Sequence, residues 1–257
     1  MKRFLGGFSR IFPTSTWEKL EYVGAYFAGK GSGSSSVKEE VRGAFKFIKG
    51  DDLVLFDIGA NRGDWTEDVL RTAGRRIKNI YQFEPSEHNI DLLRGKFSGN
   101  DRVRLLPYAA SDRSGSAEFF SDVPGSGMAS LYKRKLDHFN IALNNIAHIE
   151  TTTVDEVIKK YGISRVDFMK MDIEGHELAA LHGAEASLKD GVIKALSFEF
   201  GGANIDSRTY FQDFWYFLSP LGYVFFRILP SGSVVQVKSY NEMLENFRTT
   251  NYIAVRR

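Results

Sequence analysis

Short apolar runs alternate with segments of helical periodicity along most of this chain. In the helical segments, apolar residues recur at the spacing expected for one buried face of a helix. We predict strands at 53–58, 79–84, 103–108, 166–172, 195–200, 222–229, 234–237 and 251–256, and helices at 37–49, 64–72, 87–97, 176–188 and 210–218. Strands that alternate with helices are typical of a doubly wound α/β domain with a mostly parallel sheet.

Two segments depart from this alternation. Residues 16–28 form a short amphipathic pattern, and residues 29–36 are rich in glycine and serine, as flexible linkers are. We therefore expect residues 1–36 to form a helical extension with a Gly/Ser linker, and residues 37–257 to form the main domain. Residues 121–150 fit neither periodicity. Ligands of α/β sheets bind over the carboxyl ends of the strands, so we expect this insertion to be a lid or wall of a substrate site.

Composition narrows the classes of protein that fit. Among 257 residues, 43% are hydrophobic, which is enough to bury a sizeable core. The net charge is +2, from 34 basic and 32 acidic residues, so the balance gives no support to a nucleic-acid binder. Cysteine is absent, which excludes disulfides, thiolate nucleophiles and cysteine-bound clusters.

The chain offers no transmembrane segment, because no apolar run approaches the ~18 residues that a membrane-spanning helix needs. The basic and apolar start could make weak peripheral contact with a membrane through Lys2, Arg3, Phe4, Leu5 and Phe8. A loosely packed leader is the alternative explanation for these residues. We expect a cytoplasmic protein.

The loop after the first predicted strand indicates the kind of ligand. It reads D-x-G-x-N-x-G from Asp57 to Gly63. A dinucleotide-binding loop would have glycine where Asn61 and Asp64 stand, and a phosphate-binding P-loop is absent. The Asp57 carboxylate would repel a phosphate but favour an ammonium group. We therefore expect an adenosyl ligand that carries an amino acid.

Polar residues after the next two strands agree with this ligand. Glu84 ends the second strand, where a carboxylate can accept hydrogen bonds from both hydroxyls of a ribose. Ser111 and Asp112 follow the third strand and could meet the edge of an adenine. An acid after a strand is often only a helix cap, so each signal alone is weak. Their order along three strand ends makes the combination more specific.

The motifs together resemble the FkbM family of class I S-adenosylmethionine-dependent methyltransferases. They are FDIGANRG (56–63), FEPSEHNIDLL (83–93), AASD (109–112), TTVDEVI (152–158) and MKMDIEGHELAALHGA (169–184). The resemblance implies a Rossmann-like, seven-stranded sheet and S-adenosylmethionine as cofactor. It also implies methyl transfer to a hydroxyl, often on sugars of surface polysaccharides or on natural products. The implied cofactor residues are Asp57, Gly59, Ala60, Asn61, Gly63, Glu84, Ser111 and Asp112.

The best candidates for a base follow the strand at 166–172. Methyl transfer to a hydroxyl requires alignment of the acceptor oxygen and removal of its proton. Asp172, Glu174 and His176 are the predicted catalytic residues. His176 has the side chain best suited to proton transfer near neutral pH, although it could instead lie at the surface. Glu174 and Glu177 could also serve the start of a helix, and for Glu177 we expect such a structural role.

Further candidates are Glu199 and Tyr210. Asp172 and Glu199, at neighbouring strand ends, could share an Mg²⁺ ion through oxygen ligands, or Glu199 could order the next loop or the acceptor. Tyr210 is a predicted substrate contact. The apolar residues of 211–218 fall at helical spacing, so we expect them to pack in the core rather than stack on a sugar.

We expect an O-methyltransferase that acts on a sugar, polysaccharide or glycosylated metabolite, and three alternatives stay open. Methylation of nucleic acid is disfavoured, because a cysteine nucleophile is absent and DIEG replaces the [DNS]-P-P-[YF] loop of amino-methylases. A nicotinamide-dependent sugar oxidoreductase is disfavoured by the missing glycines. A non-catalytic module that binds an adenosyl ligand, or a scaffold, would keep the fold without the reaction.

Overall fold

The computed structural model describes residues 12–33 and 36–257, and its main feature is a sheet of eight strands. The order across the sheet is β10-β9-β11-β8-β7-β1-β2-β3. The pairs among β1, β2, β3, β7 and β8 are parallel, whereas β11 runs antiparallel to both β8 and β9. The bounds are β1 Leu53–Ile58, β2 Ile77–Phe83, β3 Val103–Leu106, β7 Phe168–Met171, β8 Ala195–Phe200, β9 Tyr223–Ile228, β10 Val234–Val237 and β11 Thr250–Arg256.

The predicted doubly wound, mostly parallel sheet is confirmed, with eight strands where the resemblance implied seven. The strand predicted at 234–237 is the short β10, which pairs antiparallel with β9 at the edge of the sheet. Strands alternate side chains between their two faces, and β1 illustrates the result. Leu53 and Leu55 join one apolar cluster, whereas Phe56 and Ile58 join the other. The sheet is therefore buried on both faces, as parallel sheets are.

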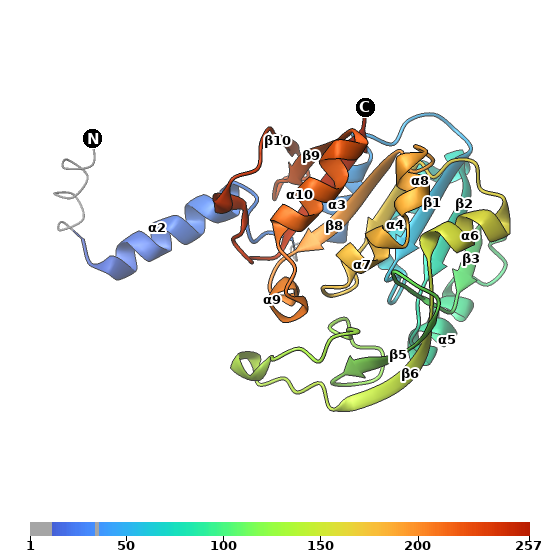
Figure 1. Ribbon diagram of the computed structural model, residues 1–257, viewed down its shortest axis with the longest axis horizontal. Coiled ribbons are helices and arrows are strands. Elements are labelled where there is room, and N and C mark those ends of the chain that lie inside the picture. Colours follow the sequence, from blue (N-terminus) through green and yellow to red (C-terminus); the bar gives the residue numbers. More distant parts are fainter. Residues whose placement is uncertain (1–11, 34–35) are drawn as a thin grey trace.

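Helices cover both faces of the sheet (Figure 1). One cluster contains residues of α3 (Val37–Ala44) and α4 (Asp64–Ala73). The other contains residues of four further helices, namely α6 Val154–Tyr161, α7 Glu177–His182, α8 Glu185–Lys189 and α10 Phe211–Leu218. The remaining helical elements are α5 Glu87–Lys96, α9 Ala203–Ser207 and short 3₁₀ turns at Gly74–Arg76, Asp137–Phe139, Ser219–Leu221 and Glu242–Leu244.

Aromatic residues dominate the core under α10. Phe211 and Phe214 of this helix are fully buried, as predicted. The ring of Phe214 stacks on Phe198 of β8, with 4.5 Å between ring centroids. The prediction that this aromatic helix packs in the core is therefore confirmed.

Several predicted elements end early for local reasons. The helix expected at 176–188 is divided into α7 and α8. At Gly183, between them, a Cβ atom would lie 1.9 Å from the backbone oxygen of Ser111, so the chain passes too close for any side chain. Strand β3 ends at Leu106 because proline follows at position 107 and cannot donate to a ladder. Helix α3 ends at Ala44, five residues before the predicted end.

A second, smaller sheet extends away from the first (Figure 1). It contains β4 (Ala109–Ala110), β5 (Gly115–Ser121) and β6 (Asn145–Thr152), in the order β4-β6-β5. The insertion at 121–150 runs from the end of β5 into β6. Neither strand was predicted. Most side chains of β6 are exposed on both faces, so its sequence lacks the alternation that identifies a half-buried strand.

In the described part of the N-terminal extension, the first helix is α2 (Thr14–Phe27), which projects from the main body (Figure 1). The Gly/Ser segment after it was expected to be flexible, but residues 29–33 contact the domain. The Gly33 amide donates to the Thr249 carbonyl at 2.8 Å, and the Asn251 side chain donates to the Gly33 carbonyl at 3.1 Å. A Cβ atom at Gly33 would lie 2.9 Å from Thr249 backbone atoms, so glycine permits this close approach.

The residues predicted to contact a membrane, at positions 2–8, lie outside those that the structure describes. Within residues 12–33 and 36–257, every helix is too short or too polar to span a bilayer.

Candidate cofactor and active site

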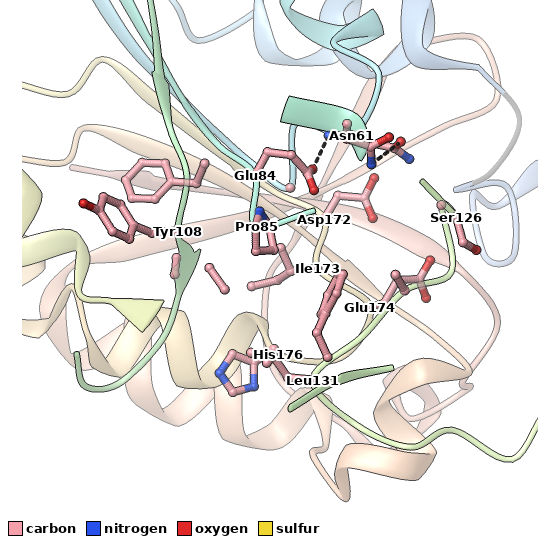
Figure 2. A pocket seen from close by; sticks show the side chains of 18 residues that line it. Asn61, Glu84, Pro85, Tyr108, Ser126, Leu131, Asp172, Ile173, Glu174 and His176 are labelled. Atoms are coloured by element: carbon pink, nitrogen blue, oxygen red, sulfur yellow. Dashed lines mark hydrogen bonds between the residues drawn. The ribbon is translucent and has the colours of Figure 1, made fainter. Parts of the chain in front are cut away.

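A pocket opens at the carboxyl ends of β1, β2 and β7 (Figure 2). It encloses about 600 Å³, part of it open to solvent. Of the predicted cofactor residues, Gly59, Asn61 and Glu84 line the pocket, and of the predicted catalytic residues, Asp172, Glu174 and His176 line it.

The loop after β1 is held tightly against the ends of two strands. Gly59 has a φ of +77°, and its amide donates to the Phe83 carbonyl at 3.0 Å. A Cβ atom at Gly59 would lie 2.0 Å from the Asp172 carbonyl oxygen. Both the backbone conformation and the lack of space therefore require glycine there.

Glu84 directly follows β2, and its buried side chain lies against the loop after β1. One of its carboxylate oxygens accepts the Asn61 amide at 2.7 Å, and the other accepts the Ser86 amide at 2.9 Å (Figure 2 shows the Asn61 contact). Burial raises the pKa of Glu84, and the two amide hydrogen bonds oppose this rise. The Asn89 side chain is a third hydrogen-bond partner of Glu84. A carboxylate has about four acceptor sites, so Glu84 can still accept a hydrogen bond from a ligand hydroxyl.

Lys170 lies beneath the loop, and we did not predict it. Its ammonium donates to the Gly59 carbonyl at 2.9 Å and is 3.5 Å from an oxygen of both Asp57 and Asp172. Burial lowers the pKa of Lys170, but Asp172 and Asp57 raise it more, so the net shift is upward. The sequence did contain a signal for Lys170, because it lies inside the apolar run of β7 and a buried lysine needs a charged partner.

Asp57 supports the loop from behind rather than lining the pocket. Its side chain is fully buried and accepts a hydrogen bond from the Thr66 hydroxyl at 2.7 Å. Burial raises the pKa of Asp57, whereas Lys170 lowers it. Two other predicted cofactor residues, Ala60 and Gly63, are likewise outside the lining. The Gly63 amide donates to the Ala60 carbonyl, which closes the turn before α4.

Ser111, Asp112 and His176 form one hydrogen-bonded group. The Ser111 hydroxyl is 3.0 Å from an Asp112 oxygen and 2.9 Å from His176 Nε2. We predicted Ser111 and Asp112 to bind the cofactor and His176 to act in catalysis, yet the three side chains lie next to one another. Burial lowers the pKa of His176 to about 4, with Asp112 opposing. The imidazole is therefore neutral at neutral pH.

The remaining acids after β7 differ in exposure. Asp172 faces the pocket with 45% of its side chain exposed. Glu174 forms an ion pair with Arg134 of the insertion. Burial and the Asp172 charge raise the pKa of Glu174 to about 8, although Arg134 opposes the rise. Glu177 is buried and accepts the Ile173 amide at 2.9 Å, which is a structural role.

The insertion closes one side of the pocket. Ser126, Gly127, Ala129 and Leu131 belong to its lining. The neighbouring Ser130 hydroxyl donates to the Glu174 carbonyl at 2.8 Å. The insertion is thus attached to the loop after β7, beside the candidate catalytic residues. Its function as a substrate lid stays a prediction.

Glu199 and Tyr210 do not line this pocket. Burial, followed by the charges of Asp172 and Glu174, raises the pKa of the half-buried Glu199. Tyr210 is 52% exposed. In the described ranges 12–33 and 36–257, no three histidine, aspartate or glutamate side chains are arranged to hold a metal ion. An Mg²⁺ ion between Asp172 and Glu199 stays a prediction.

Comparisons with known proteins agree with the motifs. A model of the methyltransferase FkbM domain matches residues 57–225. The chain is 28% identical over 165 residues to the 2-O-methyltransferase NoeI of Sinorhizobium fredii, across 60% of this chain and 66% of NoeI. It is 27% identical over 144 residues to the hexuronic acid methyltransferase AglP of Haloferax volcanii, across 54% of this chain and 53% of AglP.

A crystal structure shares the fold. It is that of a methyltransferase FkbM from Methylobacillus flagellatus, which aligns with a TM-score of 0.51 at 17% identity, over 81% of this chain and 45% of that chain. The chain thus spans less than two thirds of the length of this structure and of AglP, and 66% of NoeI. The matched family model extends over more than half of the chain and includes every predicted cofactor residue. The chain belongs to the FkbM methyltransferase family.

Proposed function

We propose that this protein is an S-adenosylmethionine-dependent O-methyltransferase that methylates a hydroxyl of a sugar, polysaccharide or glycosylated metabolite. The observation that carries the proposal is the single pocket that joins Gly59, Asn61 and Glu84 to Asp172 at the carboxyl edge of the sheet. The name of NoeI supports methylation of an oxygen, and the name of AglP supports a sugar acid as the kind of acceptor. The expected cytoplasmic location and the exclusion of nucleic acid stay predictions.

The residues of the pocket fit the proposed cofactor. Glu84 is a buried carboxylate that accepts the Asn61 and Ser86 amides and retains acceptor capacity for a hydroxyl of a ribose. Gly59 leaves no room for a side chain, so a ligand can approach the backbone of the loop closely. The cofactor would supply a methyl group already activated on a sulfonium.

The chain's own residues would orient the acceptor and take its proton. Asp172 is exposed and lines the pocket, so its carboxylate is our candidate for the base that accepts the proton of the acceptor hydroxyl. Glu174 is less suited to this role, because its side chain is mostly buried in an ion pair with Arg134, whereas Asp172 stays exposed beside Lys170. The insertion would exclude water from the pocket through residues 126–131.

Calorimetric titration with S-adenosylhomocysteine tests the proposed cofactor. We expect micromolar binding, about −8 kcal/mol, and at least tenfold weaker binding for Glu84→Ala. Glu87→Ala removes an exposed acid three residues further on and should bind normally. If NAD⁺ alone bound, the site would belong to an oxidoreductase. Failure of both ligands to bind would favour the scaffold alternative.

An acceptor screen then tests the reaction. Neutral sugars, hexuronic acids and glycosylated metabolites would be incubated with labelled S-adenosylmethionine, with RNA as a control substrate. Methyl ethers would be located by mass spectrometry. Asp172→Asn should retain S-adenosylhomocysteine binding within about tenfold yet lose most turnover, and a chelator would reveal any need for Mg²⁺. Full activity of Asp172→Asn would exclude Asp172 as the base.

A further inference from the structure

The pocket has a polar end and a mostly apolar middle. Glu84 and Asn61 lie together at one end of the view in Figure 2, and His176 lies at the other. Among the other lining residues, Asn89, Ser126, Asp172 and Glu174 are polar. The apolar or aromatic ones include Phe83, Tyr108, Ala109, Ala110, Phe119, Leu131 and Ile173.

This arrangement suits a flat, apolar ring between two polar ends. If Glu84 holds the ribose, as in the proposed function on which this inference rests, the attached adenine must lie within reach of it. Ser111 and Asp112 directly follow Ala109 and Ala110 of the lining, and they line an adjoining cavity that shares Leu131 and His176 with the pocket. The edge of the ring would therefore meet the group formed by Ser111, Asp112 and His176.

The hydrogen bonds of His176 bear on the role we first predicted for it. A hydroxyl has one proton to donate. When Ser111 donates it to Asp112, at 3.0 Å, the neighbouring imidazole must donate from Nε2 to the Ser111 oxygen, at 2.9 Å. The other nitrogen, Nδ1, is buried and has no hydrogen-bond partner in the described part of the chain. Neither nitrogen is then both accessible and free to take a proton from an acceptor.

We propose that His176 is a positioning residue of the cofactor site, which acts through Ser111 to hold the Asp112 carboxylate against the exocyclic amino group of adenine. It is then not the base of the reaction. The lowered pKa of His176 agrees, because burial keeps the imidazole neutral and makes it a weak base. Tyr132 of the insertion packs on the other side, with 5.5 Å between the ring centroids, so the imidazole is held from two directions.

Titration with two ligands that differ only at the base tests this inference. S-adenosylhomocysteine carries the amino group, and S-inosylhomocysteine has an oxygen in its place. We expect the wild type to prefer the adenine ligand by at least tenfold. His176→Ala should weaken binding of the adenine ligand about tenfold and reduce the preference below threefold. Asp112→Asn should also abolish the preference.

Two further variants separate positioning from general structure. His176→Gln can keep an N–H donor near the position of Nε2 and should retain most of the preference. His182→Ala removes an exposed histidine at the end of the same helix and should behave as the wild type. Thermal unfolding would verify that each variant is folded. His176→Ala should raise the KM for S-adenosylmethionine by a larger factor than it lowers kcat.

Three results would overturn the inference. One is unchanged binding of S-adenosylhomocysteine by His176→Ala together with a large loss of turnover, which would make His176 the base. The second is equal weakening of both ligands, which would mean that His176 only maintains the pocket. The third is a wild type that binds both ligands equally. A wild type that binds neither ligand would instead refute the proposed function itself.

Discussion

Replacement of Lys170 by methionine tests the charge arrangement beneath the cofactor loop. The side chain of Lys170 is 7% exposed and that of Asp57 is fully buried, so methionine would leave a carboxylate in the interior without its cation. Removal of one partner from a buried pair typically costs about 3–5 kcal/mol. Asp172 is exposed enough to be solvated, so most of the loss should come from Asp57. We expect a loss near the lower end, about 3 kcal/mol, at neutral pH.

The loss should depend on pH in a definite direction. Burial already raises the pKa of Asp57 in the folded protein, and without Lys170 the pKa must rise further. The folded state then binds a proton that the unfolded state releases. Stability therefore falls as the pH rises from the unfolded value, about 4, through the raised folded value. The variant should lose less stability at pH 5 than at pH 8.

Urea unfolding at both pH values, followed by circular dichroism, measures the effect. Lys78→Met is the matched control, because Lys78 is an exposed lysine on strand β2, and its replacement should leave stability nearly unchanged. The double variant Asp57→Asn with Lys170→Met should recover part of the loss, because no buried charge remains. A loss for Lys170→Met within about 1 kcal/mol of the control, or a larger loss at pH 5 than at pH 8, would refute the reasoning.

Three other substitutions test different parts of the molecule. Gly59→Ala places a Cβ atom 2.0 Å from the Asp172 carbonyl, so S-adenosylhomocysteine should bind at least tenfold more weakly by calorimetry; normal binding would contradict the close packing of the loop. Arg134→Ala should speed dissociation of the same ligand in stopped-flow measurements, whereas the exposed neighbour Lys135→Ala should not, because only Arg134 pairs with Glu174. Phe198→Ala should lower the free energy of unfolding by about 3–5 kcal/mol, and a small effect would mean that the aromatic core relaxes readily.

Local patterns in the sequence predicted the parts of the fold that local physics determines. Strands β1, β2, β7 and β8 are short apolar runs buried on both faces, so their periodicity and length sufficed. Gly59 and Glu84 were found because they occupy the ends of such strands. The strands β5 and β6 were missed, because an exposed arm imposes no alternation of apolar and polar residues.

Contacts between distant residues could not be predicted in the same way. Ser111 and His176 are 65 positions apart, and each alone is compatible with several roles. Lys170 is meaningful only once Asp57 on β1 and the Gly59 carbonyl are known to face it. In the same way, the closeness of Gly33 to Thr249 depends on where the start of strand β11 lies, which the Gly/Ser composition does not reveal.

The position of strand β11 has a consequence for how the protein is made. This strand lies between β8 and β9, although it follows both in the chain. During synthesis, β8 and β9 therefore emerge from the ribosome with one edge each unpaired, and neither edge can be satisfied until residues 250–256 follow. Unpaired edges are the surfaces through which nascent chains associate wrongly. A chain that has not yet exposed residues 250–256 would thus present two unpaired edges, so the sheet can be completed only after the last strand is released.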